Sequence, residues 1–173
     1  MPIKKTEEEN HQILIKDIMT ATKVVAVTPD TPLLEASEKM VLGWFNGLPV
    51  IDKDRKVIGI ITEYDLLTKG TAIHIPTFIR LMGEFPGKKR QKDLLFKKSL
   101  EEMIYFTVGD VMNKDPIIMW EGSTFSNILR VFSEHHRVNP IPIVDAKGKL
   151  VGIMSRFDVI KYFSKFLKEM KSK

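Results

Sequence analysis

Two stretches of the chain, 93 residues apart, show the same order of apolar and polar positions. In residues 48–67, LPVIDKDRKVIGIITEYDLL, an apolar run ends at Asp52, a charged turn follows, and a second apolar run leads into a polar segment. Residues 141–160, IPIVDAKGKLVGIMSRFDVI, repeat this order with Asp145 in the place of Asp52. Two short apolar runs separated by a polar turn predict a β-hairpin in each stretch.

Each expected hairpin is preceded by a β-branched run and an amphipathic segment, and is followed by a second amphipathic segment. Strands are expected at 24–27 and 117–119, and closing helices at 63–68 and 156–167. The first helix of each unit should begin at a hydroxyl cap, Thr31 or Ser123–Thr124. Its apolar residues recur at helical spacing: Leu33, Ala36 and Met40, then Phe125, Ile128, Leu129 and Phe132. The second set is shifted by one place when the stretches are aligned without a gap.

The repetition extends over 49 positions, from Asp17–Asp65 to Asp110–Asp158, and the alignment needs no gap. Ten of these positions are identical, where average residue usage would give roughly three. The pairs include Met19 and Met112, and Gly59 and Gly152. The chain therefore contains an internal duplication of a β-α-β-β-α unit.

A single unit of this size has one small sheet and two helices, which is too little to bury a full core. We therefore expect an α+β fold in which the two units pack sheet to sheet about a pseudo-twofold axis. Any cleft between them would then occur twice. The expected organisation is a polar N-terminal segment (1–12), the first repeat (13–70), an inserted loop and helix (71–105), the second repeat (106–168) and a basic tail (169–173).

The insert begins with several glycines and prolines and ends in an amphipathic helix pattern at 91–106. This helix could cover one edge of the pair, mediate self-association or contact a partner, and the sequence does not decide among these roles. The net charge is +5, with basic clusters at 88–92 and after Lys161. Solvated surface is the favoured interpretation of both clusters, and nucleic-acid binding is disfavoured because no alternating basic and aromatic pattern accompanies them.

Composition narrows the function further. There is no cysteine, the N-terminus lacks the apolar core of a signal peptide, and no run reaches the ~18 apolar residues that a membrane span needs. We therefore expect a cytoplasmic protein with no membrane span. The four histidines do not stand at metal-ligand spacing with carboxylates, and no nucleotide-hydrolase or nucleophile motif is present. We expect no metal site and no enzymatic activity, and no catalytic or transport domain attached to the repeats.

Both repeats end their hairpin with Gly-φ-φ-[Ser/Thr]-x-x-Asp, where φ is an apolar residue. The motif residues are Thr62 and Asp65, then Ser155 and Asp158. A hydroxyl and free backbone N–H groups at a helix N-terminus can bind an anion, and the Asp can accept hydrogen bonds from a ribose diol. The alternative is that the hydroxyls are plain helix caps and the Asp residues are first-turn charges. The recurrence of the same spacing favours a ligand site.

These paired units resemble a tandem pair of CBS domains, a Bateman module, over residues 13–70 and 106–167. The resemblance implies that Thr62, Asp65, Ser155 and Asp158 contact the ribose and phosphate of an adenosine ligand.

A second stretch, FSEHHRVNPIPIVD, resembles the gamma subunit of the AMP-activated kinase. This resemblance implies that His136 and Arg137 bind phosphate; the alternative is an exposed turn with ordinary basic residues. The first repeat has Gly43 and Trp44 at these places, so the two clefts should differ in affinity or in ligand.

The family resemblance also implies the positions that line the adenine pocket: Thr22, Val24, Val27, Phe45, Asn46 and Gly47, then Asp115, Ile117, Val138, Asn139 and Pro140. For the valines, a place in the core is the stronger alternative.

The resulting hypothesis is a regulatory module, used as a homodimer, that binds AMP, ADP, ATP or S-adenosylmethionine as a regulatory ligand and not as a catalytic cofactor. The alternative is a ligand-independent scaffold or dimerisation protein that acts through the inserted helix.

Overall fold

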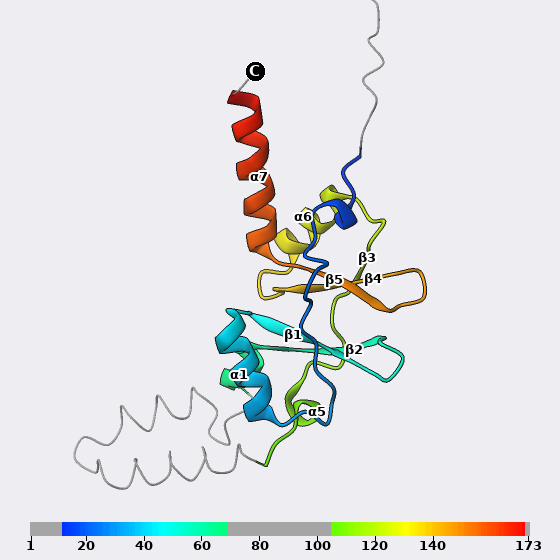
Figure 1. The fold of residues 1–173 in the computed structure, drawn as a ribbon, viewed down its shortest axis with the longest axis vertical. Helices are drawn as coiled ribbons and strands as arrows, with labels where there is room; N and C mark the ends of the chain where they lie inside the picture. The colour runs from blue at the N-terminus through cyan, green and yellow to red at the C-terminus, as the bar shows by residue number, and fades with distance from the viewer. Residues whose placement is uncertain (1–11, 69–104, 172–173) are drawn as a thin grey trace, which may run out of the picture.

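The computed structural model of the chain describes residues 12–68 and 105–171, in two halves stacked one above the other (Figure 1). Nearly all of the expected N-terminal segment and of the expected insert, with its helix at 91–106, lies outside these residues. The elements in chain order are η1 (Ile15–Asp17), α1 (Leu33–Gly43), β1 (Gly47–Ile51), β2 (Val57–Thr62), α2 (Glu63–Thr68), α5 (Val108–Val111), β3 (Met119–Trp120), α6 (Phe125–Glu134), β4 (Ile141–Val144), β5 (Leu150–Met154) and α7 (Arg156–Lys171).

Both expected hairpins are present. Strands β1 and β2 pair antiparallel, with Leu48 opposite Ile61, and β4 and β5 pair in the same way. Strand β3 adds to the second sheet in parallel with β4. The corresponding segment of the first repeat makes a single bridge, from Val27 to Val50. The α+β fold class is confirmed, but the leading strands are shorter than expected, since each contributes only one or two ladder positions.

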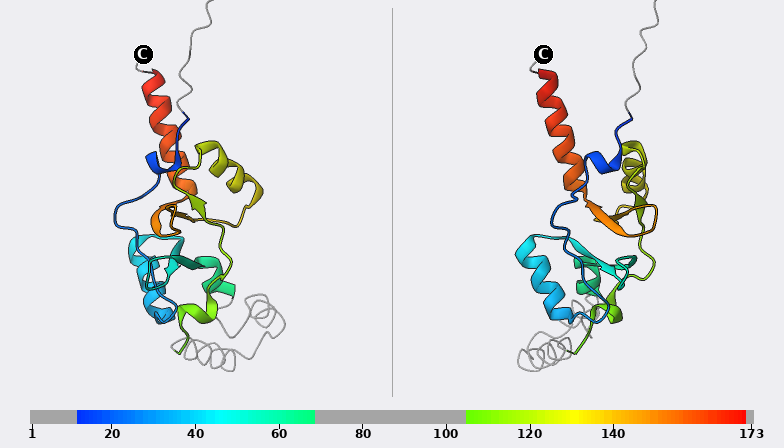
Figure 2. Two further views of the ribbon diagram at one scale, coloured as in Figure 1. Left: turned by 90° about the vertical axis from the view of Figure 1, so that its right-hand side faces the viewer. Right: turned by 45° about the vertical axis from the view of Figure 1, so that its right-hand side comes forward.

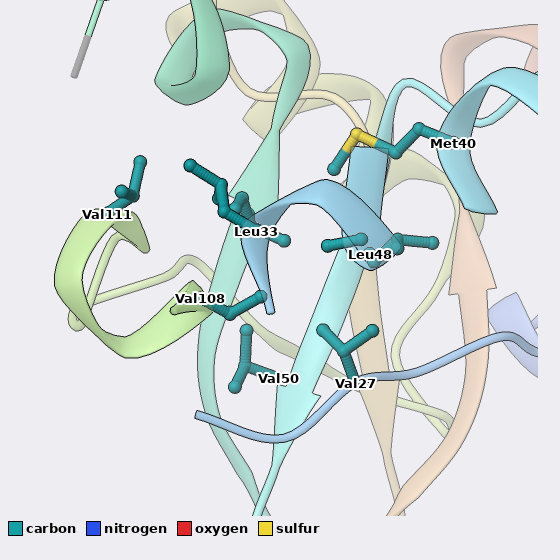
Figure 3. Close-up of a cluster of buried hydrophobic side chains, with 9 residues drawn as sticks. Val27, Leu33, Met40, Leu48, Val50, Val108 and Val111 are labelled. Carbon is teal, nitrogen blue, oxygen red and sulfur yellow. The ribbon is translucent and has the colours of Figure 1, made fainter. Parts of the chain in front are cut away.

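The helix faces are as expected, with one difference at a cap. Helix α1 buries Leu33, Ala36 and Met40, which pack with Leu48 and Val50 of β1 in the core of the first repeat (Figure 3). Helix α6 buries its own apolar face and is capped by Thr124, as predicted. The predicted cap of α1 was wrong.

The N-cap of α1 is Pro32, and the hydroxyl of Thr31 instead accepts a hydrogen bond from Thr28 N at 3.0 Å. The proline supplies a fixed φ at this entry, and the preceding threonine stabilises the turn.

The ungapped alignment of the repeats is corrected by the structure. Val27 pairs with Val50 where Met119 pairs with Ile143, so the leading strands are offset by 92 residues while the hairpins are offset by 93. The caps of α1 and α6, Pro32 and Thr124, are likewise 92 apart. The first repeat therefore has one extra residue before its leading strand, and the second has one extra residue in the turn between α6 and β4. The extra residue of the second repeat therefore lies in the turn that carries His136 and Arg137.

The two repeats exchange their leading segments. Ile15 is fully buried among Phe125, Ile128 and other core residues of the second repeat, whereas Val108 is fully buried in the core of the first. Figure 2 shows the chain running from one half to the other before α1 and again after α5. Each half is thus completed by the other repeat.

The exchange is symmetric in detail. Thr20 bridges Ile153 on the edge of β5, and Asn113 bridges Ile60 on the edge of β2. Both pairs are related by the 93-residue offset. In the same way Met19 packs on Gly152 and Met112 packs on Gly59, positions where a Cβ would collide with the methionine. These reciprocal contacts give the pair its pseudo-twofold symmetry.

Helix α7 extends well beyond the sheets (Figure 1) and is longer than predicted, running into the expected basic tail as far as Lys171. None of its residues is fully buried. In the part of the chain that the structure describes, no helix is both long enough and apolar enough to cross a membrane.

Candidate functional site

The end of β2 and the start of α2 form a hydroxyl–carboxylate corner. Thr62 donates to Asp65 Oδ2 through its hydroxyl at 2.6 Å and through its amide at 3.1 Å, and Asp65 N donates to Thr62 Oγ1 at 3.3 Å. Asp65 is only 5% exposed. The capping interpretation of the motif is therefore correct in geometry, and it fixes the carboxylate and the hydroxyl beside each other.

The second repeat forms the same corner. Ser155 donates to Asp158 Oδ2 from its hydroxyl at 2.6 Å and from its amide at 2.8 Å. The other oxygen of Asp158, Oδ1, accepts a hydrogen bond from the hydroxyl of Thr20 at 3.2 Å. Thr20 comes from the exchanged segment of the first repeat. The second corner therefore contacts a residue of the first repeat.

A cavity of about 370 Å³ opens beside the first corner, a size found for small-molecule sites. It lies between the repeats. The first repeat contributes Ile60, Thr62, Tyr64 and Asp65; the second contributes Asn113, Pro116, Ile117, Arg137, Val138, Asn139 and Pro140. Asp65 thus faces the leading segment and the turn before β4 of the second repeat, a pairing that the sequence left open.

The wall of this cavity combines apolar and charged side chains. Ile117, Val138 and Pro140 supply apolar wall, which suits a flat aromatic ring. Asp65 and Arg137 supply groups of opposite charge. A ligand that carries a ring, hydroxyls and an anionic group would match all three features.

Arg137, from the second repeat, contacts the first repeat at the wall of the cavity. Its guanidinium lies 5.4 Å from the centre of the Tyr64 ring, and Nη1 donates to the Tyr64 hydroxyl at 3.3 Å. Across the described residues the one ion pair joins Glu35 and Lys39, so Arg137 has no carboxylate at ion-pair distance within them. Sequence reasoning missed Tyr64; its place inside the motif TEYD was the only available signal.

The turn that carries Arg137 is held by Arg156, which sequence reasoning also missed. Arg156 Nη2 donates to the carbonyls of Phe132, His135 and His136 at 2.8, 3.1 and 3.2 Å. These carbonyls lie at the C-terminal end of α6, where a cation is favourable. Asn139 Oδ1 accepts a hydrogen bond from Arg156 N at 2.9 Å. Both sides of the turn are therefore tied to the first residue of α7.

Several predicted site residues lie together along the cavity: Thr62, Asp65, Ile117, Arg137, Val138, Asn139 and Pro140. His136 and Asp115 do not line it. His136 is exposed, and its carbonyl is used by Arg156.

The first-repeat residues predicted for the other pocket are dispersed. Val27 is buried in the core, in agreement with the alternative interpretation of the valines. Gly47 packs against Pro140. Thr22 and Val24 precede the Val27 bridge, the former exposed and the latter half-buried.

Phe45 and Asn46 line a different hollow, of about 420 Å³, on the outer face of α1 and α2. Its walls are mostly apolar and include Met40, Trp44 and Leu66. Partial burial raises the pKa of Glu63 at its edge above the usual 4.5, and hydrogen bonds from the backbone and from Asn46 oppose this shift.

Within residues 12–68 and 105–171, no group of three or more His, Cys, Asp or Glu side chains could hold a metal ion.

Relatives of known sequence resemble both halves of the chain. The uncharacterized protein MJ1426 of Methanocaldococcus jannaschii is 30% identical over 156 residues, which cover 86% of this chain and 90% of the relative. The CBS domain-containing protein CBSX2 of Arabidopsis thaliana, a chloroplastic protein, is 27% identical over 167 residues. This alignment covers 88% of the chain but only 64% of the plant protein.

The fold is also that of solved structures. The crystal structure of CBSX2 from Arabidopsis thaliana in complex with AMP has a TM-score of 0.66 at 26% identity, covering 89% of this chain and 98% of that one. The structure of the same plant protein described as a CBS-pair protein gives a TM-score of 0.68. The family model of the CBS domain matches residues 15–70 and again 108–165. The chain therefore belongs to the CBS-domain family and carries two copies of the domain.

Proposed function

We propose that the chain is a regulatory module that binds an adenine nucleotide in the cavity between Asp65 and Arg137. The observation that carries this proposal is the composition of that cavity. A carboxylate and a hydroxyl from one repeat share the cavity with a guanidinium and apolar walls from the other. The AMP complex of CBSX2, a relative with the same fold, supports the choice of an adenosine ligand.

Each part of a nucleotide has a matching group. Thr62 and Asp65 supply hydrogen-bonding groups for a ribose, and Ile117, Val138 and Pro140 supply the wall for the base. Arg137 supplies donors for phosphate oxygens, which a guanidinium binds as a planar fork. AMP, ADP and ATP satisfy this arrangement. S-adenosylmethionine fits less well, because its sulfonium would lie near the cationic Arg137.

The second corner is proposed to bind differently. Its carboxylate already accepts the Thr20 hydroxyl, and the corresponding turn of the first repeat, residues 43–46, contains no basic residue. Ser155 and Asp158 therefore face no equivalent cation from that position. We expect a weaker site there, or one for an unphosphorylated ligand.

We also propose that the protein forms a homodimer and acts by regulation rather than by catalysis. Helix α7 exposes Ile160, Phe163, Leu167 and Met170 on successive turns, and a partner copy would bury them. Ligand in the cavity would favour one arrangement of the repeats over another, by no more than its difference in affinity for the two. A cytoplasmic location remains a prediction.

Isothermal titration calorimetry and thermal unfolding with AMP, ADP, ATP and S-adenosylmethionine test the proposal. A ligand at ~100 times its Kd should stabilise the protein by roughly 2.7 kcal/mol. Asp65→Asn should weaken the tighter binding event at least about tenfold, since an amide replaces the charged acceptor. The matched variant Asp158→Asn should leave that event unchanged. Absence of any shift with all four compounds would exclude the proposed function.

A further inference from the structure

The contact between Tyr64 and Arg137 lies at the wall of the cavity and joins the two repeats. Tyr64 belongs to α2 of the first repeat, and Arg137 belongs to the turn before β4 of the second. The ring lies 5.4 Å from the guanidinium carbon, and the phenol oxygen lies 3.3 Å from Nη1. Both side chains line the cavity.

The backbone and the guanidinium of Arg137 make different contacts. Its backbone is fixed because Arg156 binds the carbonyls just before it and Asn139 just after it is bonded to Arg156 N. Its guanidinium, on an exposed side chain with four rotatable bonds, contacts Tyr64. The guanidinium carbon lies near the ring, and the phenol accepts a hydrogen bond from one of the five N–H groups, which leaves the others for another acceptor.

We propose that Tyr64 is a positioning residue that holds the Arg137 guanidinium over the cavity and thereby sets the preference of the site for phosphorylated over unphosphorylated nucleosides. The inference rests on the proposed nucleotide site and adds a residue and a selectivity to it. A guanidinium that is already oriented loses less conformational entropy when it binds phosphate, so affinity for the phosphorylated ligand rises selectively.

The chain contains an internal comparison for this role. At the 93-residue offset of the hairpins, Tyr64 corresponds to Phe157, and the turn of the first repeat that corresponds to the one carrying Arg137, residues 43–46, has no basic residue. The second corner therefore lacks both the phenol and the guanidinium at these positions. Phe157 is 68% exposed and provides a matched aromatic position at the first turn of the equivalent helix.

The test compares AMP with adenosine, which differ only in the phosphate, by calorimetry on the full chain. The wild-type protein should prefer AMP by about tenfold or more, the scale of hydrogen bonds to a charged group. Tyr64→Ala should reduce the affinity for AMP by about fivefold through the entropy cost of ordering one long side chain, and change that for adenosine less than twofold. Tyr64→Phe, which keeps the ring, should lose less affinity for AMP than Tyr64→Ala. Phe157→Ala should change neither affinity.

A double-mutant cycle isolates the mechanism. Arg137→Ala should abolish the preference for AMP, and Tyr64→Ala should have no further effect in that background. The inference would be overturned if Tyr64→Ala lost equal affinity for AMP and for adenosine, or if both Tyr64 variants kept the wild-type preference for AMP. Either result would leave the proposed nucleotide site standing. Failure of the wild-type chain to bind either compound would instead refute the proposed function. Thermal unfolding of each variant checks its folding. Tyr64→Phe, which removes only the hydroxyl, should be destabilised least.

Discussion

Pro140 packs directly against Gly47, its equivalent in the other repeat. A Cβ placed on Gly47 would lie 3.0 Å from Pro140 Cδ and 2.9 Å from the carbonyl oxygen of Ile61. Since the two positions are related by the 93-residue offset, this contact lies where the pseudo-twofold axis passes between the repeats. The close approach places Pro140, a wall of the cavity, next to the end of β2 from which Thr62 projects.

Gly47→Ala should therefore destabilise the protein. The added methyl group meets backbone atoms on one side and the proline ring on the other, so either β1 or the opposing turn must move. Overpacking of this kind costs about 1–3 kcal/mol, which urea unfolding would detect as a lower midpoint. Gly148→Asn is the matched control, because a Cβ at Gly148 meets nothing within 4 Å and Asn tolerates its φ of +77°. Equal midpoints for Gly47→Ala and the wild type would contradict this packing.

Stability should fall in acid partly through Asp110. The amide and the hydroxyl of Thr107 both donate to Asp110 Oδ2 at 2.8 Å, and these bonds lower the pKa of Asp110 below its usual 3.8. An acid whose folded pKa is lowered stabilises the fold above its unfolded pKa, and this contribution is lost as the pH falls through the folded value. Asp110→Asn should therefore be less stable than the wild type at pH 7, and the two should converge below pH 3.8.

Urea midpoints at pH 7 and at pH 3 measure this convergence. Asp54→Asn is a suitable control, because Asp54 lies in the turn between β1 and β2 and caps no helix. A difference between Asp110→Asn and the wild type that is the same at both pH values would show that the Thr107 bonds act independently of the charge.

Self-association should depend on the projecting part of α7. Leu167 and Met170 are 57% and 61% exposed, and they continue the apolar positions Ile160 and Phe163 along one side of the helix. Leu167→Glu combined with Met170→Glu should convert a dimer to a monomer, because two charges cannot be buried without partners. Light scattering after gel filtration gives the mass. Lys168→Glu changes charge on the same turn without an apolar loss, and a monomer there as well would point to charge rather than burial.

The local elements were predictable because their signals lie within a few residues. The hairpins follow from two apolar runs around a turn, and the cap of α6 follows from Thr124 before an amphipathic segment. The corners were predictable for the same reason, since hydroxyl and carboxylate are three residues apart. Thr31 failed as a cap because its hydroxyl accepts a hydrogen bond from Thr28 N and the helix begins after Pro32.

The relations between the repeats were not predictable, because packing over long distances in sequence determines them. The one-residue slip between Val27 and Met119 showed in the sequence only as the one-place shift between the apolar faces of the two first helices, which did not locate the extra residues. No local pattern indicated the pairing of Asp65 with the second repeat or the contact between Tyr64 and Arg137, which are 73 residues apart. From the sequence, Tyr64 has the pattern of an ordinary surface residue in the first turn of a helix, because its partner Arg137 comes from the opposite repeat.

Because the leading segments are exchanged, a mutation in the leading segment of one sequence repeat should destabilise the half of the structure that is built mainly from the other repeat. Ile15 belongs to the first repeat but packs with Phe125 and Ile128, whereas Val108 belongs to the second but packs with Leu33 and Leu48. Ile15→Ala should cost about 2–5 kcal/mol as a buried truncation, and its effect should be felt in the half that Ile15 completes. Val108→Ala should weaken the other half, by less because fewer atoms are removed.

Hydrogen exchange resolves the two halves, since subglobal opening is measured amide by amide. Ile15→Ala should lower the protection of amides in β4, β5 and α6 more than in β1 and β2, and Val108→Ala should do the reverse. Leu129→Ala, at a half-buried position within α6, provides a control whose effect should stay in its own repeat. If Ile15→Ala instead loosened the first hairpin selectively, the leading segments would pack within their own repeats. The bridge between Asn113 and Ile60, which brings the second repeat next to Asp65, would then be absent.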